Sequence, residues 1–167
     1  TGLEGIVNAL DGITMNVPFD VRLTHPWHPE NKNKLITSGE HFFDGEMVTE
    51  VVHERYSLSN GEYGRQQLQK EALVGIAKKA LSPKTIPKLP QLVESFSDFI
   101  IATNMSNSDI ISFAFAVKDF DPDNQIHYHQ LEGESKSLYD DILKNYNSQI
   151  VMNEEEMKKI VDEYFIH

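Results

Sequence analysis

The sequence of 167 residues contains no cysteine, which excludes a disulfide scaffold and zinc sites with cysteine ligands. It has no run near the roughly 20 apolar residues of a membrane-spanning helix, and its start does not resemble a secretory signal. Basic residues are scarce: Lys and Arg total 15 against 26 Asp and Glu, giving a formal net charge of −11. Nucleic-acid binding requires a basic face, so we expect no nucleic-acid partner. An anionic substrate would need a local group of basic residues.

Common catalytic motifs are also missing from the sequence. It contains no P-loop, no dinucleotide fingerprint, no G-x-S-x-G and no H-E-x-x-H. The remaining composition is ordinary for a globular protein, since 40% of the residues are hydrophobic and 10% are aromatic. We therefore predict a single domain over residues 1–167 with a sizeable core.

Hydrophobic periodicity predicts helices alternating with strands. Helices are predicted at residues 3–10, 47–52, about 63–81, 89–99, 107–117 and 153–164, and strands at 13–17, 19–23, 126–131 and 149–152. Residues 24–34 carry turn-forming residues and predict an exposed loop. Residues 110–117 are apolar nearly all round, which predicts a deeply buried helix. The pattern indicates the α/β class, with a sheet covered by helices.

The segment 53–71 contains the most promising chemistry, because it holds Arg55 and Arg65 in an otherwise acidic chain. Arg65 and Gln69 are four residues apart and share one face of the predicted helix. Guanidinium groups bind phosphate through planar, charge-assisted contacts, and a helix start favours anions. A phosphate-type site is therefore one hypothesis. The alternative is that both arginines are surface residues paired with nearby carboxylates: Glu54, Glu62 or Glu71.

Other sites compete with this hypothesis. Four histidines define a zinc alternative: His25, His28, His127 and His129. Two exposed histidines on an edge strand are the simpler interpretation of the second pair. An acidic run resembles the start of a calcium loop, but its sixth and twelfth positions hold Asn124 and Gln130, so a plain turn is predicted. Trp27 lies between two prolines, where it would either stack on a sugar or anchor its loop.

Three stretches resemble the LytR–CpsA–Psr family of cell-envelope proteins. They are L-E-G-I-V-N-A-L-D-G-I-T-M-N-V-P at 3–18, F-D-G-E-M-V-T-E-V-V-H-E-R-Y-S-L-S-N-G-E-Y-G-R-Q-Q-L-Q-K-E at 43–71, and T-N-M-S-N-S-D-I-I-S-F-A at 103–114. The middle stretch is similar to the family's R-x-R, G-D-F-G-R and R-Q motifs, without a gap. The resemblance implies a mixed β-sheet flanked by helices in αβα layers, with this chain as the C-terminal portion of a larger domain.

The resemblance also implies an activity. Family members transfer glycopolymers such as teichoic acid or capsular polysaccharide from a polyprenyl pyrophosphate carrier to peptidoglycan. They work on the extracytoplasmic face of the cell membrane in mainly Gram-positive bacteria, with assistance from Mg²⁺. The membrane anchor and the magnesium ligands would lie in an N-terminal half outside this chain, so no metal ligand is predicted within it.

By position, the resemblance assigns pyrophosphate binding to Arg55, Arg65 and Gln69, with the two arginines as the catalytic, charge-stabilising groups. His53 and Leu68 stand where the family has arginine. Histidine can still hydrogen-bond phosphate, whereas leucine cannot.

The resemblance leaves three functions open. The first is a glycopolymer phosphotransferase. The second is a catalytically decayed module that binds wall polymer or polyprenyl phosphate, which the replaced arginines favour. The third is a transcriptional regulator or attenuator, against which the acidic charge and the missing helix-turn-helix signal argue.

Overall fold

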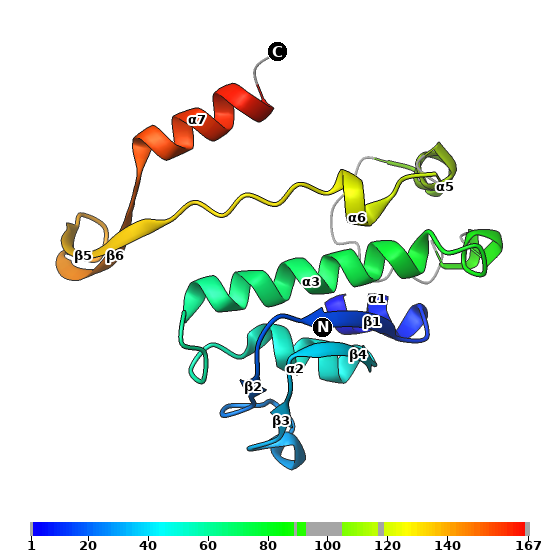
Figure 1. Ribbon diagram of the computed structural model, residues 1–167, viewed down its shortest axis with the longest axis horizontal. Helices are drawn as coiled ribbons and strands as arrows, with labels where there is room; N and C mark the ends of the chain where they lie inside the picture. Colours follow the sequence, from blue (N-terminus) through cyan, green and yellow to red (C-terminus); the bar gives the residue numbers. More distant parts are fainter. Residues whose placement is uncertain (1, 89, 93–104, 117–118, 166–167) are drawn as a thin grey trace. The chain divides into compact units, whose positions relative to one another are not determined.

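The computed structural model of the chain describes residues 2–88, 90–92, 105–116 and 119–165, and these fall into two compact units (Figure 1). The first unit comprises Thr1–Ile126 and the second His127–His167. The single domain predicted for residues 1–167 stays a prediction. Among the described residues, no helix is both long enough and apolar enough to cross a membrane.

The first unit contains most of the helices. They are α1 (Gly2–Ala9), α2 (Gly45–His53), α3 (Glu62–Ala80), α5 (Asn107–Ala116) and α6 (Pro122–Gln125), with the 3-10 turns η1 (Pro29–Asn31) and η2 (Ile86–Lys88). Its strands are β1 (Ile13–Val17), β2 (Val21–Arg22), β3 (Leu35–Ile36) and β4 (Gly39–Phe43). The second unit contains β5 (Gly133–Asp140), β6 (Asn145–Met152) and α7 (Glu154–Tyr164).

The strands pair in three antiparallel ladders: β1 with β4, β2 with β3, and β5 with β6. The predicted α/β class is confirmed. The sheet differs in detail from the expected mixed sheet, because every ladder of the described residues is two-stranded and antiparallel. β4 was missed by the periodicity, because its burial alternates only weakly and Phe42 is 64% exposed.

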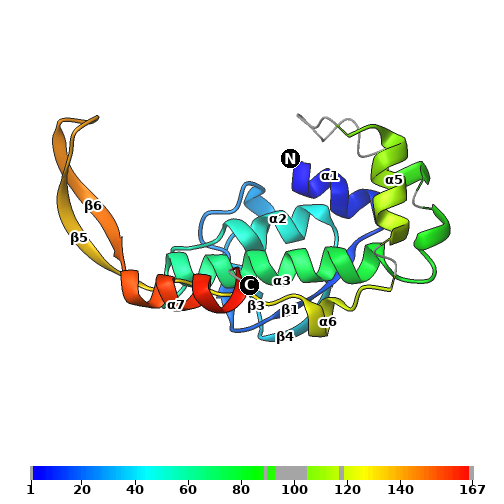
Figure 2. The same cartoon turned by 90° about the horizontal axis from the view of Figure 1, so that it is seen from above.

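The core of the first unit lies between the β1–β4 ladder and the helices α1, α2 and α3 (Figure 2). Alternation along β1 places Ile13, Met15 and Val17 in this core, while Thr14 and Asn16 are exposed on the opposite face. Helices therefore cover one face of this ladder, and the predicted covering of both faces is not found among the described residues.

Gly75 lets α3 lie directly on β1. A Cβ atom added at this glycine would lie 2.5 Å from the Thr14 carbonyl oxygen and 3.2 Å from the Ile13 side chain. We expect Gly75→Ala to lower the free energy of unfolding by about 2 kcal/mol, because overpacking a backbone contact outweighs the gain in helix propensity. Urea denaturation measures this change.

Leu73→Ala is the matched control for Gly75→Ala, since Leu73 lies on the same helix and is 64% exposed. It should change the free energy of unfolding by less than about 0.5 kcal/mol. A Gly75→Ala protein as stable as the wild type would contradict the packing of α3 on β1.

Several local predictions are confirmed. The strand at residues 13–17 and the helices α1, α2 and α3 have nearly their predicted bounds. α7 begins after Asn153, whose side chain accepts hydrogen bonds from the backbone amides of Glu155 and Glu156. α5 follows Ser106, whose hydroxyl accepts from the Asp109 amide while the Asp109 carboxylate accepts from the Ser106 amide.

Other predictions, which concern the burial of apolar residues on helices, are wrong. Leu73 is one of the apolar residues of the helix predicted at about 63–81, yet it is exposed. The helix of residues 110–117 was expected to be deeply buried, yet Phe113 is 62% and Phe115 is 42% exposed. An apolar sequence predicts a preference for burial, but burial also requires a surface that covers the helix. Of the helix predicted at 89–99, only residues 90–92 lie within the described part of the chain, and these are helical.

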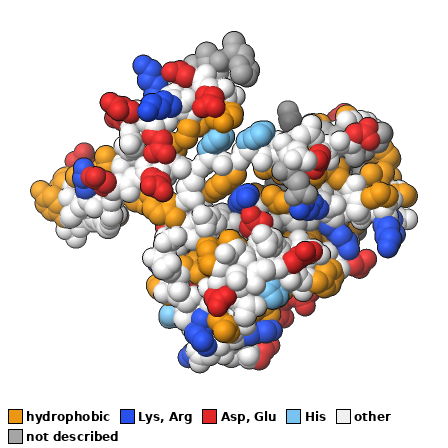
Figure 3. Space-filling view, viewed as in Figure 1, with side chains coloured by type: hydrophobic (Ala, Val, Ile, Leu, Met, Phe, Trp, Pro, Cys, Tyr) orange, Lys and Arg blue, Asp and Glu red, His pale blue; other side chains and the backbone are white. Residues whose placement is uncertain are grey.

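The second unit is a β-hairpin followed by α7. The strand predicted at residues 126–131 is wrong: these residues have no regular structure, and β5 begins at Gly133. The hairpin turn is fixed by the Asp140 carboxylate, which accepts hydrogen bonds from the backbone amides of Ile142 and Leu143 at 2.8 and 2.9 Å. The turn presents these two side chains outward, where Figure 3 shows hydrophobic atoms at the end of the hairpin.

Candidate functional site

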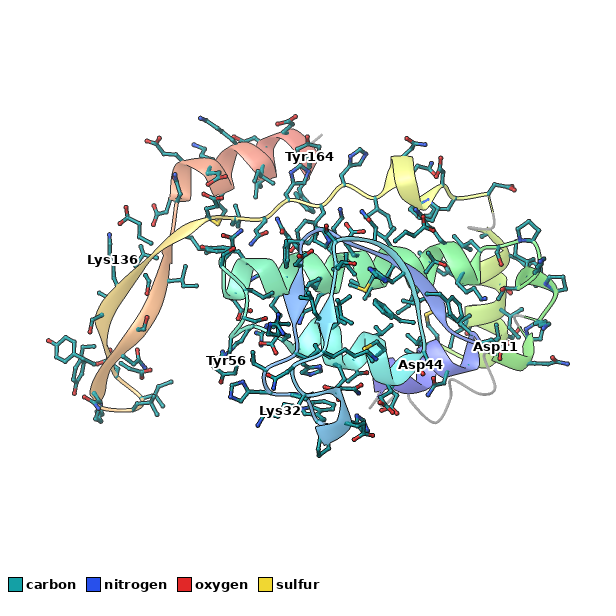
Figure 4. The ribbon with its side chains drawn as sticks, turned by 60° about the horizontal axis from the view of Figure 1, so that its bottom comes forward. Asp11, Lys32, Asp44, Tyr56, Lys136 and Tyr164 are labelled. Carbon is teal, nitrogen blue, oxygen red and sulfur yellow. The ribbon has the colours of Figure 1, made fainter. Side chains whose placement is uncertain are left out.

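The candidate site is built around the C-terminal end of α2. The helix begins at Asp44, whose side chain accepts a hydrogen bond from the Met47 amide, and the chain turns away after His53. Figure 4 shows Asp44 and Tyr56 at opposite ends of this helix. Two glutamates near the C-terminal end, Glu50 and Glu54, are 3% and 5% exposed. Such carboxylates are rarely buried without partners.

The Glu54 carboxylate connects the loop of residues 24–34 to the turn that follows α2. Its carboxylate accepts hydrogen bonds from the Thr24 amide at 2.6 Å and from the Thr24 hydroxyl at 3.0 Å. It also accepts from the amides of Tyr56 and Ser57 at 2.8 and 3.1 Å. Burial alone would raise the pKa of Glu54, but these hydrogen bonds lower it below its ordinary value. The carboxylate is therefore charged at neutral pH.

Glu50 lies one helical turn before Glu54 and also binds the loop of residues 24–34. It accepts hydrogen bonds from the backbone amides of Trp27 and His28 at 2.9 and 2.8 Å, and from His28 Nδ1 at 2.8 Å. Burial opposes ionisation of Glu50, yet the backbone hydrogen bonds and the imidazole lower its pKa overall. The hydrogen bond to Glu50 also raises the pKa of His28.

Residues 24–34 are thus not the simple exposed loop that the sequence predicts. Asn31 is buried and lies in η1, and the carboxylates of Glu50 in α2 and of Glu54 directly after it hold the first part of the segment. The sequence predicted no role for Glu50, and it offered Glu54 only as an ion-pair partner of an arginine. The spacing E-x-x-x-E could have indicated that both are buried, because it places the two carboxylates on one side of a helix whose buried stripe includes Val51.

Arg55 is exposed beside Tyr56. Its guanidinium carbon lies 4.9 Å from the centre of the Tyr56 ring, and Nη2 donates a hydrogen bond to the Tyr56 hydroxyl at 3.2 Å. The hydrogen bond to Tyr56 is the main cause of a raised Arg55 pKa, and the Glu62 carboxylate contributes to it. Arg55 therefore presents a permanent positive charge at the surface.

Arg65 lies in the first turn of α3 and forms an ion pair with Glu62, with Nη2 2.6 Å from Oε1. The alternative in which an arginine pairs with Glu62 is thus confirmed for Arg65. Its Nε–H is buried and has no acceptor among the described residues. Gly64 allows this turn to lie close to Leu58 and Phe19, because an added Cβ atom would lie 3.2 and 3.3 Å from their side chains.

Glu62 interacts unequally with the two arginines. It pairs directly with Arg65, whereas it contributes least to the raised pKa of Arg55, whose guanidinium contacts Tyr56 instead. Gln69 follows Arg65 by one helical turn and is exposed. Leu68 is completely buried in the core.

His53 faces a different neighbour. Its ring centre lies 4.3 Å from that of Trp27, and Nδ1 lies 2.8 Å from the Thr49 carbonyl oxygen. A carbonyl only accepts, so Nδ1 carries the proton and Nε2 remains available to a ligand.

The zinc and calcium alternatives find no support in the geometry. Within the described ranges, no three His, Asp or Glu side chains gather closely enough to hold a metal ion. The two pairs of histidines belong to different units, and His129 instead packs on Tyr164 with ring centres 4.1 Å apart. Residues 122–125 of the acidic run form the short helix α6, and the Asn124 side-chain amide donates to the Asp121 carboxylate just before it.

Comparison with known proteins gives a family match. The profile of the LytR_cpsA_psr family matches residues 1–165. Biofilm regulatory protein A of Streptococcus mutans is 27% identical over 142 residues, covering 82% of this chain and 33% of that protein. The polyisoprenyl-teichoic acid–peptidoglycan teichoic acid transferase TagU of Enterococcus faecalis is 31% identical over 113 residues, covering 68% of this chain and 34% of that protein.

The fold is also similar to a solved structure. The crystal structure of TagV from B. subtilis superimposes with a TM-score of 0.75 and 19% identity, covering 97% of this chain and 58% of that one. The chain spans about a third of the length of the two curated relatives.

Proposed function

The chain belongs to the LytR_cpsA_psr family, and from this membership we propose that it is part of a glycopolymer phosphotransferase. The reaction would move teichoic acid or capsular polysaccharide from a polyprenyl pyrophosphate carrier to peptidoglycan. The transferase TagU, which is named for such a reaction, supports the proposal. The observation that carries it is Arg65, whose guanidinium is held at the start of α3 by Glu62, with Arg55 exposed on the turn before that helix.

The proposed role of these arginines is electrostatic. Arg65 would exchange Glu62 for a phosphate oxygen. Exposed Arg55 would neutralise a second oxygen of the pyrophosphate, with Gln69 donating a hydrogen bond and His53 donating from Nε2 only when its ring is protonated. Phosphoryl transfer depends mainly on positioning and charge stabilisation. These residues would therefore stabilise the charge of the transition state, and none of them would be the nucleophile that attacks phosphorus. An acceptor hydroxyl forms the new P–O bond, and polyprenyl phosphate leaves.

The family also implies Mg²⁺, but the described residues do not fit a magnesium site. Glu62 is already paired with Arg65, and no group of carboxylates gathers near it among the described residues. We therefore expect the ligands of Mg²⁺ to lie outside this chain. We further propose that the protein acts at the extracytoplasmic face of the cell membrane, held there by an N-terminal anchor.

Binding of geranyl diphosphate tests the proposal directly. Calorimetric titration of the chain should show saturable binding, and Arg55→Ala should weaken it about tenfold, because one charge-assisted contact is lost. Arg22→Ala is the matched control, since the Arg22 guanidinium donates to the Asn33 carbonyl on another loop. Absence of saturable binding to the wild-type chain would contradict the proposal.

A second candidate function is a non-catalytic module that binds wall polymer or polyprenyl phosphate. The replaced arginines favour it, since His53 carries charge only when protonated and Leu68 lies in the core. His53→Arg in the full-length protein separates the two functions. A large gain in glycopolymer transfer would indicate a weakened enzyme, and no gain would favour the binding module.

A further inference from the structure

We propose that Asn60 is a site of spontaneous deamidation, and that its conversion to aspartate or isoaspartate weakens anion binding at the start of α3. Asn60 is the one asparagine of the chain that a glycine follows. It is exposed in the turn between α2 and α3, and Gly61 directly precedes α3. The modification itself needs no ligand, whereas its effect on anion binding rests on the proposed function.

The reaction needs only Asn60, Gly61 and water. The Gly61 backbone nitrogen loses its proton and attacks the carbonyl carbon of the Asn60 side chain. A C–N bond forms, the side-chain nitrogen leaves as ammonia, and the product is a cyclic succinimide. Water then opens the ring. Addition of water at the side-chain carbon gives aspartate, and addition at the main-chain carbon gives isoaspartate.

The surroundings of this peptide bond leave the attack open. The Asn60 side chain is exposed, and its amide makes no hydrogen bond within the described ranges. Apart from its chain neighbours, Gly61 has open space beside it, because an added Cβ atom would meet nothing within 4 Å. The φ angle of Gly61 is +50°, a conformation that favours glycine over residues with a side chain. The fold of this turn therefore requires the residue that makes Asn60 reactive.

One hydrogen bond opposes the reaction. The Gly61 amide donates to the Leu58 carbonyl oxygen at 3.1 Å, and this bond has to open before the nitrogen can attack. Leu58 is buried, but Ser59 and Asn60 are both exposed, so the turn can open without disturbing the core. We therefore expect Asn60 to react more slowly in the folded protein than in the unfolded chain, and faster than any other asparagine.

Deamidation would place a carboxylate at the start of α3. The Asn60 carbonyl oxygen accepts from the Tyr63 amide at 3.1 Å, and the Gly61 carbonyl oxygen accepts from the Arg65 amide at 3.2 Å. Aspartate at this position adds a negative charge close to Glu62, which already competes for the Arg65 guanidinium. An incoming diphosphate would be repelled. Isoaspartate also lengthens the main chain by one methylene group, which displaces the turn from the helix.

Peptide mapping by mass spectrometry tests the modification without any ligand. The chain is incubated at mildly alkaline pH, both folded and in urea, and Asn60 should be the first asparagine converted in each sample. Asn33 is the internal control, because it is also exposed and has a positive φ angle but precedes Lys34, whose side chain hinders the attack. An unchanged Asn60 in the folded protein, after the unfolded chain has been converted, would overturn the inference.

Two variants test the effect on binding. Asn60→Asp reproduces the aspartate product and should weaken the binding of geranyl diphosphate about threefold, as expected for one added exposed charge. Asn33→Asp is the matched control, because it adds the same charge to the loop before β3 and should leave the affinity unchanged. Asn60→Gln forms the corresponding ring far more slowly, so it should keep its affinity during an incubation that lowers the affinity of the wild type.

The two measurements separate this inference from the proposed function. If Asn60 converts but fresh wild-type protein does not bind geranyl diphosphate, the proposed function fails and the modification site stands. If the fresh protein binds and Asn60 stays intact, the modification site fails and the proposed function stands. If Asn60 converts and the incubated protein binds as tightly as the fresh protein, the effect on anion binding is overturned.

Discussion

Arg65→Ala is expected to weaken the binding of geranyl diphosphate by about 100-fold, because it removes charge-assisted hydrogen bonds that are individually strong. A second effect adds to the first. Glu62 loses its ion-pair partner, so an unpaired carboxylate would face the incoming phosphates and repel them. Calorimetric titration of the wild type and the variant measures the change.

Two further variants identify the origin of this effect. Arg65→Lys keeps the charge but loses the planar pair of donors, and it should recover only part of the affinity. Glu62→Gln removes the carboxylate that competes for Arg65 and should strengthen binding. If Arg65→Ala bound geranyl diphosphate as well as the wild type, Arg65 would not be part of a pyrophosphate site.

Glu54→Ala is expected to lower the free energy of unfolding by about 3 kcal/mol, because buried donors would lose their acceptor. These donors are the amides of Thr24, Tyr56 and Ser57 and the Thr24 hydroxyl. Urea denaturation gives the change, with Glu40→Ala as the control because Glu40 is exposed on β4. A Glu54→Ala protein of wild-type stability would contradict the role of this carboxylate in holding the two segments.

The same carboxylate gives the stability a defined dependence on pH. The pKa of Glu54 in the folded protein is below the ordinary value of 4.5, because the hydrogen bonds from Thr24 and Ser57 outweigh the effect of burial. Its contribution is therefore complete above about pH 4.5 and is lost as the pH falls through the folded-state pKa. Glu54→Gln should be less stable than the wild type at neutral pH, and the difference should shrink on acidification. A difference independent of pH would show that the Glu54 charge is not stabilising.

His28 acts in the opposite direction on the pH scale. Its pKa is raised above the ordinary 6.5, mainly by the hydrogen bond to Glu50. The contribution of the protonated imidazole is complete below 6.5 and is lost as the pH rises through the raised value. The loop of residues 24–34 is therefore held most firmly between about pH 4.5 and pH 6.5, where Glu50 and Glu54 are charged and His28 is protonated.

The candidate site was only partly predictable from sequence. Arg65 and Gln69 share a helical face, and this follows from their spacing of four residues. The position of Arg55 does not follow from spacing, because it depends on how residues 54–61 turn between α2 and α3. The buried Glu54 decides that turn by binding the amides of Tyr56 and Ser57. Sequence patterns treat glutamate as a solvent-facing residue, so this determinant was missed.

By itself, the sequence determined the elements whose causes are local. The helices α2 and α3, the strand β1 and the start of α7 at Asn153 follow from apolar spacing and capping residues, which act within a few positions. Only the tertiary structure decided the groups that meet across the chain. Glu54 binds Thr24 thirty positions away, and Trp27 packs on His53. Such contacts depend on how the core brings distant segments together, and local periodicity carries no information about that arrangement.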